Sequence, residues 1–225
     1  MHGETYAEGS RRGRSEKAHP RVLPASPNSL QMTQRTLNSH GAMTAPTTSS
    51  EQDLRYPIGR ADTKTPLAAG ERAQRIDAIA ALPAQLRKAV AGLNDAQLDT
   101  PYRPGGWTVR QLVHHVADSH MNAFTRFRLG FTEDNPTIKP YDEKAWTELP
   151  DNRHLPVEIS LQLLDALHER MVHMLRSVPP AYFERSIQHP ENGPMTLDAV
   201  VSMYAWHGQH HTAHVTGLRQ REGWG

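Results

Sequence analysis

Histidine is the residue type through which this sequence could do metal chemistry. The 225-residue chain contains 14 histidines and no cysteine. A transition-metal site in such a chain must use imidazole nitrogens and carboxylate oxygens as ligands. Eleven of the histidines lie between positions 114 and 214, and most of these form two clusters. The first cluster is His114, His115 and His120, and the second is His207, His210, His211 and His214.

The spacing of the second cluster predicts pairs of histidines on one face of a helix. Residues four apart on a helix share a face and can bind one metal ion. His207 and His211 form such a pair, and so do His210 and His214. On a helical wheel, His207 and His211 face the apolar stripe, His214 lies near it, and His210 lies at its edge. The pair His207/His211 is therefore the better candidate for interior ligands.

The first cluster is harder to orient. On the wheel His120 lies near the middle of the apolar stripe, His115 lies at its flank, and His114 faces away. The wheel favours His120 over His115 as an interior residue. It does not say which of the two is a ligand.

The remaining histidines of this region have simpler interpretations. A lone interior histidine is more often a hydrogen-bonded core residue than a ligand, and we interpret His168 in this way. His154 and His173 are expected at the surface or in loops, and His189 is expected to be structural. An inward pair of histidines with further histidines on another helix favours a metal site. The sequence contains no His-Glu-X-X-His motif, which excludes a zincin-type protease.

Four stretches with helical periodicity must position these side chains. Apolar residues recur at intervals of three and four within residues 69–93, 108–131, 157–178 and 196–219. Pro83 is expected to kink or split the first helix. Thr108 and Gln111 have the spacing of a capping box at the start of the second. A long proline-containing connection, residues 132–156, follows, and no segment is predicted to be a strand. The pattern predicts an all-α four-helix bundle with one long crossover loop.

Composition separates the start of the chain from the rest. Within residues 1–50 the only Ile, Leu, Val or Phe residues are Val22, Leu23, Leu30 and Leu37. Such a stretch buries too little apolar surface to offset an ordering cost of roughly 1–2 kcal/mol per residue. We predict a disordered low-complexity tail over residues 1–52, with a start codon assigned too early as an alternative origin. Residues 53–225 are predicted to form one metal-binding domain.

Charge and hydropathy exclude several functions. The formal net charge is +1, which argues against a general nucleic-acid or membrane-surface binder. No run of about 18 apolar residues is present, so no transmembrane helix is expected. The tail also lacks the apolar core of a secretory signal. Without cysteine, a disulfide framework and a thiolate nucleophile are excluded.

Several long motifs resemble those of a known family. They lie at residues 56–59, 99–122, 139–146 and 204–214, and include Pro-Gly-Gly-Trp-Thr at 104–108 and His-His-Val-Ala-Asp at 114–118. In this order, over about residues 54–225, they resemble the YfiT-like metal-dependent hydrolases of the DinB superfamily. Bacillithiol-transferase-like proteins belong to the same superfamily.

The resemblance implies a four-helix bundle that holds one divalent metal ion with three histidines. The family motifs place these ligands at His115, His207 and His211. That placement overrules the wheel's preference for His120. It also makes Asp118, one turn after His115, a candidate hydrogen-bond partner of that ligand. The resemblance further implies a homodimer in the cytoplasm. Gln209 stands where some relatives carry a further histidine, at a position that is not a ligand.

Three neutral imidazoles would leave a divalent ion with at least one open coordination position. Zinc is the first expectation, and nickel, iron and copper are alternatives because imidazole suits all of them. An open Zn²⁺ lowers the pKa of bound water to about 7 and supplies hydroxide for hydrolysis of a small-molecule substrate. The first hypothesis is therefore a metal-dependent hydrolase.

Two other functions compete with hydrolysis. Metal hydrolases commonly use a carboxylate base, and the only candidates here are Asp118, Asp165 and Glu169. An open metal ion could instead stabilise the thiolate of an external low-molecular-weight thiol, which is then transferred to an electrophile. The lack of cysteine suits a thiol cosubstrate, and the superfamily includes such S-transferases. The third hypothesis is a non-catalytic, metal-stabilised bundle used for dimerisation or stress binding.

Overall fold

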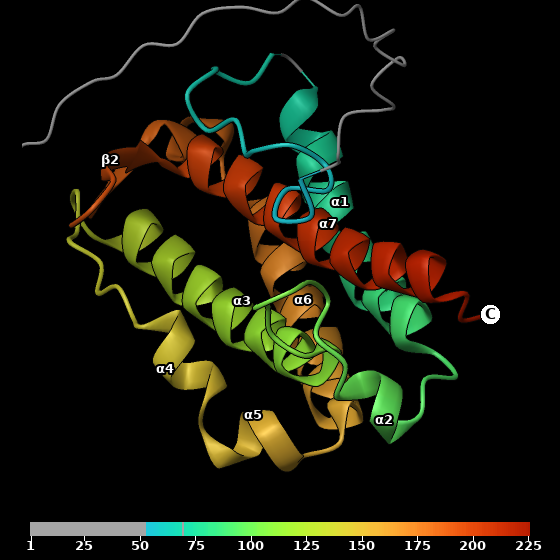
Figure 1. Ribbon diagram of the computed structural model, residues 1–225. Helices are drawn as coiled ribbons and strands as arrows, with labels where there is room; N and C mark the ends of the chain where they lie inside the picture. Colours follow the sequence, from blue (N-terminus) through green and yellow to red (C-terminus); the bar gives the residue numbers. More distant parts are fainter. Residues whose placement is uncertain (1–52, 69) are drawn as a thin grey trace, which may run out of the picture. The chain divides into compact units, whose positions relative to one another are not determined.

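The computed structural model describes residues 53–68 and 70–225, and the prediction for residues 1–52 lies outside them. Its long helices are α1 (Glu71–Val90), α3 (Val109–Thr132), α6 (Val157–Ser177) and α7 (Leu197–Glu222). Both α1 and α3 pack against α6 and α7 (Figure 1). This arrangement confirms the predicted all-α four-helix bundle. Among the described residues, no helix combines the length and the apolar character that crossing a bilayer requires.

Side-chain caps set the starts of the two helices that carry the histidine clusters. The Thr108 hydroxyl accepts a hydrogen bond from the Gln111 N–H, and the Gln111 side chain accepts one from the Thr108 N–H at 3.0 Å. This capping box confirms the predicted start of α3 and contributes about 1 kcal/mol. Thr196 caps α7 by accepting from the Ala199 N–H at 3.2 Å. The caps therefore define where α3 and α7 begin to present their side chains.

Buried histidines separate two apolar clusters along the bundle. One cluster includes Phe127, Met171 and Leu197, and the other includes Leu86, Leu112 and Leu164. Each of the helices α3, α6 and α7 contributes to both clusters. Between its two contributions lie His120 on α3, His168 on α6 and residues 207–214 on α7, and we call the histidines at these positions the histidine layer. A buried polar group without a partner costs about 1–3 kcal/mol. The nitrogens of this histidine layer therefore need partners.

The crossover between α3 and α6 carries two short helices, α4 (Glu143–Thr147) and α5 (Pro150–His154), which both pack on α3. Trp146 lies in α4, and its ring centroid is 4.4 Å from that of Tyr141. The Gln111 side chain of α3 donates to the Thr147 carbonyl at 2.9 Å. These contacts hold the crossover against the outer face of α3. A further short helix, α2 (Asp95–Leu98), precedes α3.

Residues 186–196 form a β-hairpin, so the prediction that no strand is present is wrong. After the 3₁₀ helix η1 (Pro180–Glu184), β1 (Ser186–His189) pairs antiparallel with β2 (Gly193–Thr196). Ile187 is 1% exposed and packs against α3, where a β-carbon on Gly130 would approach it to 3.1 Å. Strands of four residues are too short for their alternation to be detected in the sequence. Packing against α3 supplies the stability that an isolated hairpin lacks.

Helix α1 continues through Pro83 as a single helix, so of the two predicted effects the split does not occur, and the kink stays a prediction. Proline has no N–H, and the carbonyl four residues earlier, that of Ile79, therefore loses its helical donor. His168 on α6 replaces that donor, because its Nδ1 donates to the Ile79 carbonyl at 2.8 Å. His168 is thus a hydrogen-bonded core residue, as expected.

We expect the contribution of the hydrogen bond between His168 and the Ile79 carbonyl to the free energy of unfolding to depend on Pro83. In metal-free protein, His168→Leu should lower the free energy of unfolding by about 1–3 kcal/mol, because the Ile79 carbonyl is left unpaired. In a Pro83→Ala background the same replacement should cost less, since the restored N–H at position 83 can donate to that carbonyl. Urea unfolding of the four proteins in a double-mutant cycle measures the difference. Equal costs in the two backgrounds would contradict the dependence.

Candidate metal centre

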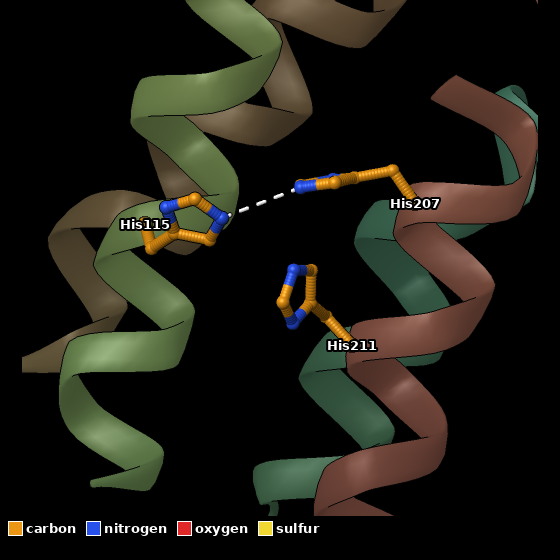
Figure 2. A group of neighbouring side chains, drawn as sticks. All are labelled: His115, His207 and His211. Atoms are coloured by element: carbon orange, nitrogen blue, oxygen red, sulfur yellow. Dashed lines mark hydrogen bonds between the residues drawn. The ribbon is translucent and has the colours of Figure 1, made fainter. Parts of the chain in front are cut away.

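The three histidines predicted as ligands lie together between α3 and α7. His115 comes from α3, and His207 and His211 come from successive turns of α7 (Figure 2). One ring nitrogen of each lies within 4.8 Å of the others. Among the described residues this is one of two groups that could hold a metal ion, and both consist of histidine alone. The structure brings the predicted set together, and their role as ligands stays a prediction.

The spacing of two ring nitrogens suits a shared ion. His115 Nε2 and His207 Nε2 lie 3.3 Å apart. Two nitrogens bound to one tetrahedral zinc ion at about 2.0–2.1 Å would lie roughly 3.3 Å from each other. The His211 ring centroid is 4.4 Å from that of His207 and 5.0 Å from that of His115. The donor set and this nitrogen spacing fit a divalent ion such as zinc.

Burial keeps the three imidazoles neutral. It lowers the pKa of His115 to about 4. It also lowers the pKa of His207 and of His211 well below the usual value, and neighbouring histidines lower both further. Metal-binding nitrogens must be unprotonated. At neutral pH, protons therefore compete little with a metal ion for these rings. His211 Nδ1 is buried without a hydrogen-bond partner among the described residues.

Two close contacts hold the site between its helices. Gly208, next to His207, packs so tightly on α1 that a β-carbon would lie 2.6 Å from the Leu82 side chain. Trp107, just before α3, packs on the His115 ring with centroids 4.6 Å apart. The turn before Trp107 contains Gly105 at φ 66°, a conformation that favours glycine. The turn therefore places an indole over one side of His115.

The second histidine group consists of His210, His211 and His214, so it shares His211 with the first. His210 stacks on Trp206 with centroids 4.2 Å apart. His214 stacks on Tyr102 with centroids 4.1 Å apart. Aromatic rings therefore occupy one face of each of these two histidines.

His210 was expected at the edge of the interior, but only 6% of it is exposed. The reason is that the segment before α1 lies over α7 at this point (Figure 1). The Trp206 indole donates to the Gly59 carbonyl at 3.2 Å, and the Tyr56 ring centroid lies 6.1 Å from that of His210. Helical periodicity within α7 carries no information about a covering segment so distant in sequence.

His114 faces away from the bundle interior, as predicted, yet it is 5% exposed. Its Nε2 donates to the Leu155 carbonyl at 3.2 Å, so its Nδ1 accepts from the Ser160 hydroxyl at 2.7 Å. Both partners lie at the end of the crossover and the start of α6. The crossover therefore buries the outer face of α3 at this point.

His120 lies in the interior, as the wheel predicts, and is 0% exposed. Its Nε2 is 3.3 Å from His207 Nδ1. Its ring also stacks on that of His168, with centroids 4.8 Å apart. His120 therefore touches a predicted ligand without belonging to either histidine group.

Residues 78–215 match the DinB superfamily, and this stretch contains all three predicted ligands. The chain belongs to the DinB superfamily. A Bacillus mycoides protein named "Putative metal-dependent hydrolase" is 53% identical over 173 residues, covering 77% of this chain and 99% of the relative. A Bacillus cereus protein whose name begins with the same words is 54% identical over 172 residues, covering 76% and 99%.

A solved structure extends the similarity to the fold of this DinB protein. YfiT from Bacillus subtilis is described as a probable metal-dependent hydrolase with an unusual four-helix bundle topology. It matches with a TM-score of 0.75 and 46% sequence identity, covering 76% of this chain and 99% of YfiT. The predicted resemblance to YfiT-like proteins is confirmed.

The DinB protein offers few carboxylates for the site. Asp118 forms a hydrogen bond with Asn152 of α5 rather than with His115, and burial raises its pKa to about 6. Asp165 pairs with Arg87 at 2.6 Å, and Glu169 is exposed. Of the three candidate bases, Asp118 is the one that lies on a helix with a predicted ligand. Its predicted hydrogen bond to His115 is wrong.

Sequence analysis missed a polar pair beside the histidines. Tyr204 belongs to one apolar cluster of the bundle, yet its hydroxyl accepts a hydrogen bond from Arg126 at 2.8 Å. Its ring centroid lies 5.2 Å from that of His120. The only sequence signal was a tyrosine one turn before His207. Pairing with Arg126 depends on how α3 and α7 pack, which that signal does not contain.

Proposed function

We propose that this DinB protein is a metal-dependent hydrolase in which His115, His207 and His211 hold one divalent ion. Zinc is the first expectation and Ni²⁺ the alternative. The observation that carries the proposal is the convergence of three neutral imidazoles from two helices, with no carboxylate in the group. Three neutral ligands leave the ion its full charge and an open position. The names of the relatives support the hydrolase assignment.

The neighbouring residues have separate roles in this proposal. A bound ion would supply Lewis acidity toward a water or a substrate carbonyl. His207 is the one partly exposed member of the three, so a small-molecule substrate would approach from its side. Trp107 covers His115 and excludes water there. Asp118, with a pKa raised to about 6, can accept a proton near neutral pH and is the candidate base.

Transfer of an external thiol to an electrophile is the second candidate function. It is favoured by the absence of a carboxylate from both histidine groups of the described residues, and by the bond between Asp118 and Asn152. Thiol transfer needs no carboxylate base, because a metal ion stabilises a thiolate directly. The chain contains no cysteine, so the thiol would come from a low-molecular-weight cosubstrate such as bacillithiol.

An assay of the metal-loaded, full-length protein separates these functions. Activated esters, amides and alkylating electrophiles would be offered with and without small thiols, and products identified by mass spectrometry. We expect hydrolysis without thiol, its loss on chelation and its return with added metal. His211→Ala, purified identically, controls for contaminating hydrolases. Thiol adducts without hydrolysis would favour transfer. No turnover at full metal content would contradict both and favour a non-catalytic bundle.

A further inference from the structure

We propose that His120 is a positioning residue that fixes the tautomer and orientation of His207, and that His168 in turn holds His120. The inference rests on the proposed metal site and extends it to two histidines outside the predicted ligand set. All three rings lie in the histidine layer between the two apolar clusters of the bundle.

The two ring nitrogens of His207 face different histidines. Its Nε2 lies 3.3 Å from His115 Nε2, and its Nδ1 lies 3.3 Å from His120 Nε2. If Nε2 binds an ion shared with His115, the proton of the neutral His207 ring must be on Nδ1. That N–H then donates to His120 Nε2. Metal-binding histidines almost always donate their second ring N–H to an acceptor. Here the acceptor is another imidazole.

The same argument assigns the proton of His120. Because its Nε2 accepts, the neutral ring carries its proton on Nδ1. The ring is 0% exposed, so bulk water does not compete for Nε2. An accepting Nε2 carries no proton, so His120 acts as a neutral acceptor for the His207 N–H.

His168 holds the plane of the His120 ring. Its Nδ1 donates to the Ile79 carbonyl that Pro83 leaves without a helical donor, so the His168 ring cannot rotate without losing that bond. The His120 ring stacks on it at 4.8 Å, with 26° between the two planes. The remaining nitrogens, His120 Nδ1 and His168 Nε2, are buried without partners. By this proton assignment His120 Nδ1 is a donor and His168 Nε2 an acceptor.

A purely structural role explains His120 less well. A buried imidazole with an unpaired nitrogen costs free energy that an apolar ring of similar size would avoid. His120 Nε2 lies beside His207 and can accept its N–H, which an apolar ring could not do. His120 is also absent from both groups that could hold an ion among the described residues, so a direct ligand role is not supported.

Two replacements separate positioning from packing. His120→Phe keeps a ring in the layer but removes the acceptor, and His120→Gln offers an amide oxygen at similar reach. We expect His120→Phe to weaken metal binding about 10- to 100-fold and His120→Gln to recover most of that loss. Kd would be measured by chelator competition, and ligand geometry by the absorption spectrum of the Co²⁺ form. His173→Phe, an exposed position on α6, should change neither.

The outcomes distinguish this inference from the proposed function. A structural role alone would lower thermal stability in both His120 variants and leave Kd and the Co²⁺ spectrum unchanged, which would overturn the inference. Absence of metal binding in the wild type would instead contradict the metal site itself. Nitrogen-15 NMR of the wild type adds a test that needs no variant. We expect a protonated His207 Nδ1 and an unprotonated His120 Nε2 in the metal-bound form. Ligation through His207 Nδ1, or a proton on His120 Nε2, would overturn the inference.

Discussion

Metal-free protein should unfold cooperatively as the pH falls from 7 towards 4. Burial lowers the pKa of His115, His168, His210 and His214 to about 4, against 6.5 for an unperturbed histidine. A histidine whose pKa is lower in the folded state binds protons more readily in the unfolded state. Its contribution to stability is present above pH 6.5, and is lost as the pH falls towards 4.

The size of the effect is comparable with the stability of the whole domain. A shift of this size corresponds to about 3 kcal/mol for each of the deeply buried rings His115 and His168, and to less for His210 and His214. Typical domains are stable by only about 5–15 kcal/mol. Burial lowers the pKa of the remaining layer residues His120, His207 and His211 as well. Asp118 and Glu143 act in the opposite sense, because burial raises the pKa of each carboxyl group and the folded state binds its proton first. Two carboxyl groups do not offset several histidines.

Urea unfolding at pH 7, 6 and 5 in the presence of a chelator measures this dependence. The free energy of unfolding should fall by more than about 1.4 kcal/mol per pH unit, the limit for a single proton. His168→Leu should reduce the slope by up to one proton, because it removes one histidine whose pKa burial lowers to about 4. Metal-loaded protein should stay folded to lower pH, because an ion bound to the folded state adds stability. Unchanged stability from pH 7 to 5 would contradict the prediction.

Features that depend on local sequence could be predicted. Periodicity located the four long helices, and the capping box of Thr108 and Gln111 located the start of α3. The helical wheel also identified His207 and His211 as interior residues, because these two side chains and the apolar stripe lie on the same face of α7. For such features, the spacing of residues within one element determines the outcome.

Features that depend on contacts between distant segments could not be predicted. A helical wheel identifies the residues in the middle of the apolar stripe. On α3 this residue is His120, which stacks on His168 of α6. The candidate site instead lies between α3 and α7, at the flank of that stripe, where His115 faces His207. Likewise, the burial of His114 depends on the crossover. The resemblance to a family supplied His115, whereas periodicity did not.

Alanine replacement across both histidine groups should show which group holds the ion. His211 belongs to both groups, His115 and His207 only to the first, and His210 and His214 only to the second. A four-ligand structural zinc site binds with about 10–16 kcal/mol, so each ligand contributes about 2.5–4 kcal/mol. Loss of one ligand should therefore weaken binding about 100- to 1,000-fold. We expect this loss for His115→Ala, His207→Ala and His211→Ala, measured as metal content after dialysis and as Kd.

The group that holds the ion is identified by comparing the His115 and His207 variants with the His210 and His214 variants. His210→Ala and His214→Ala should retain about one ion per chain. The rings of His210 and His214 stack on Trp206 and Tyr102, and neither belongs to the group that contains His115. Retention by His115→Ala and His207→Ala, with loss in His210→Ala and His214→Ala, would move the site to the second group. Far-ultraviolet circular dichroism of each metal-free variant distinguishes a lost ligand from a lost fold. A variant that is helical but metal-free has lost only the ion, and the shared His211 should show that loss whichever group is correct.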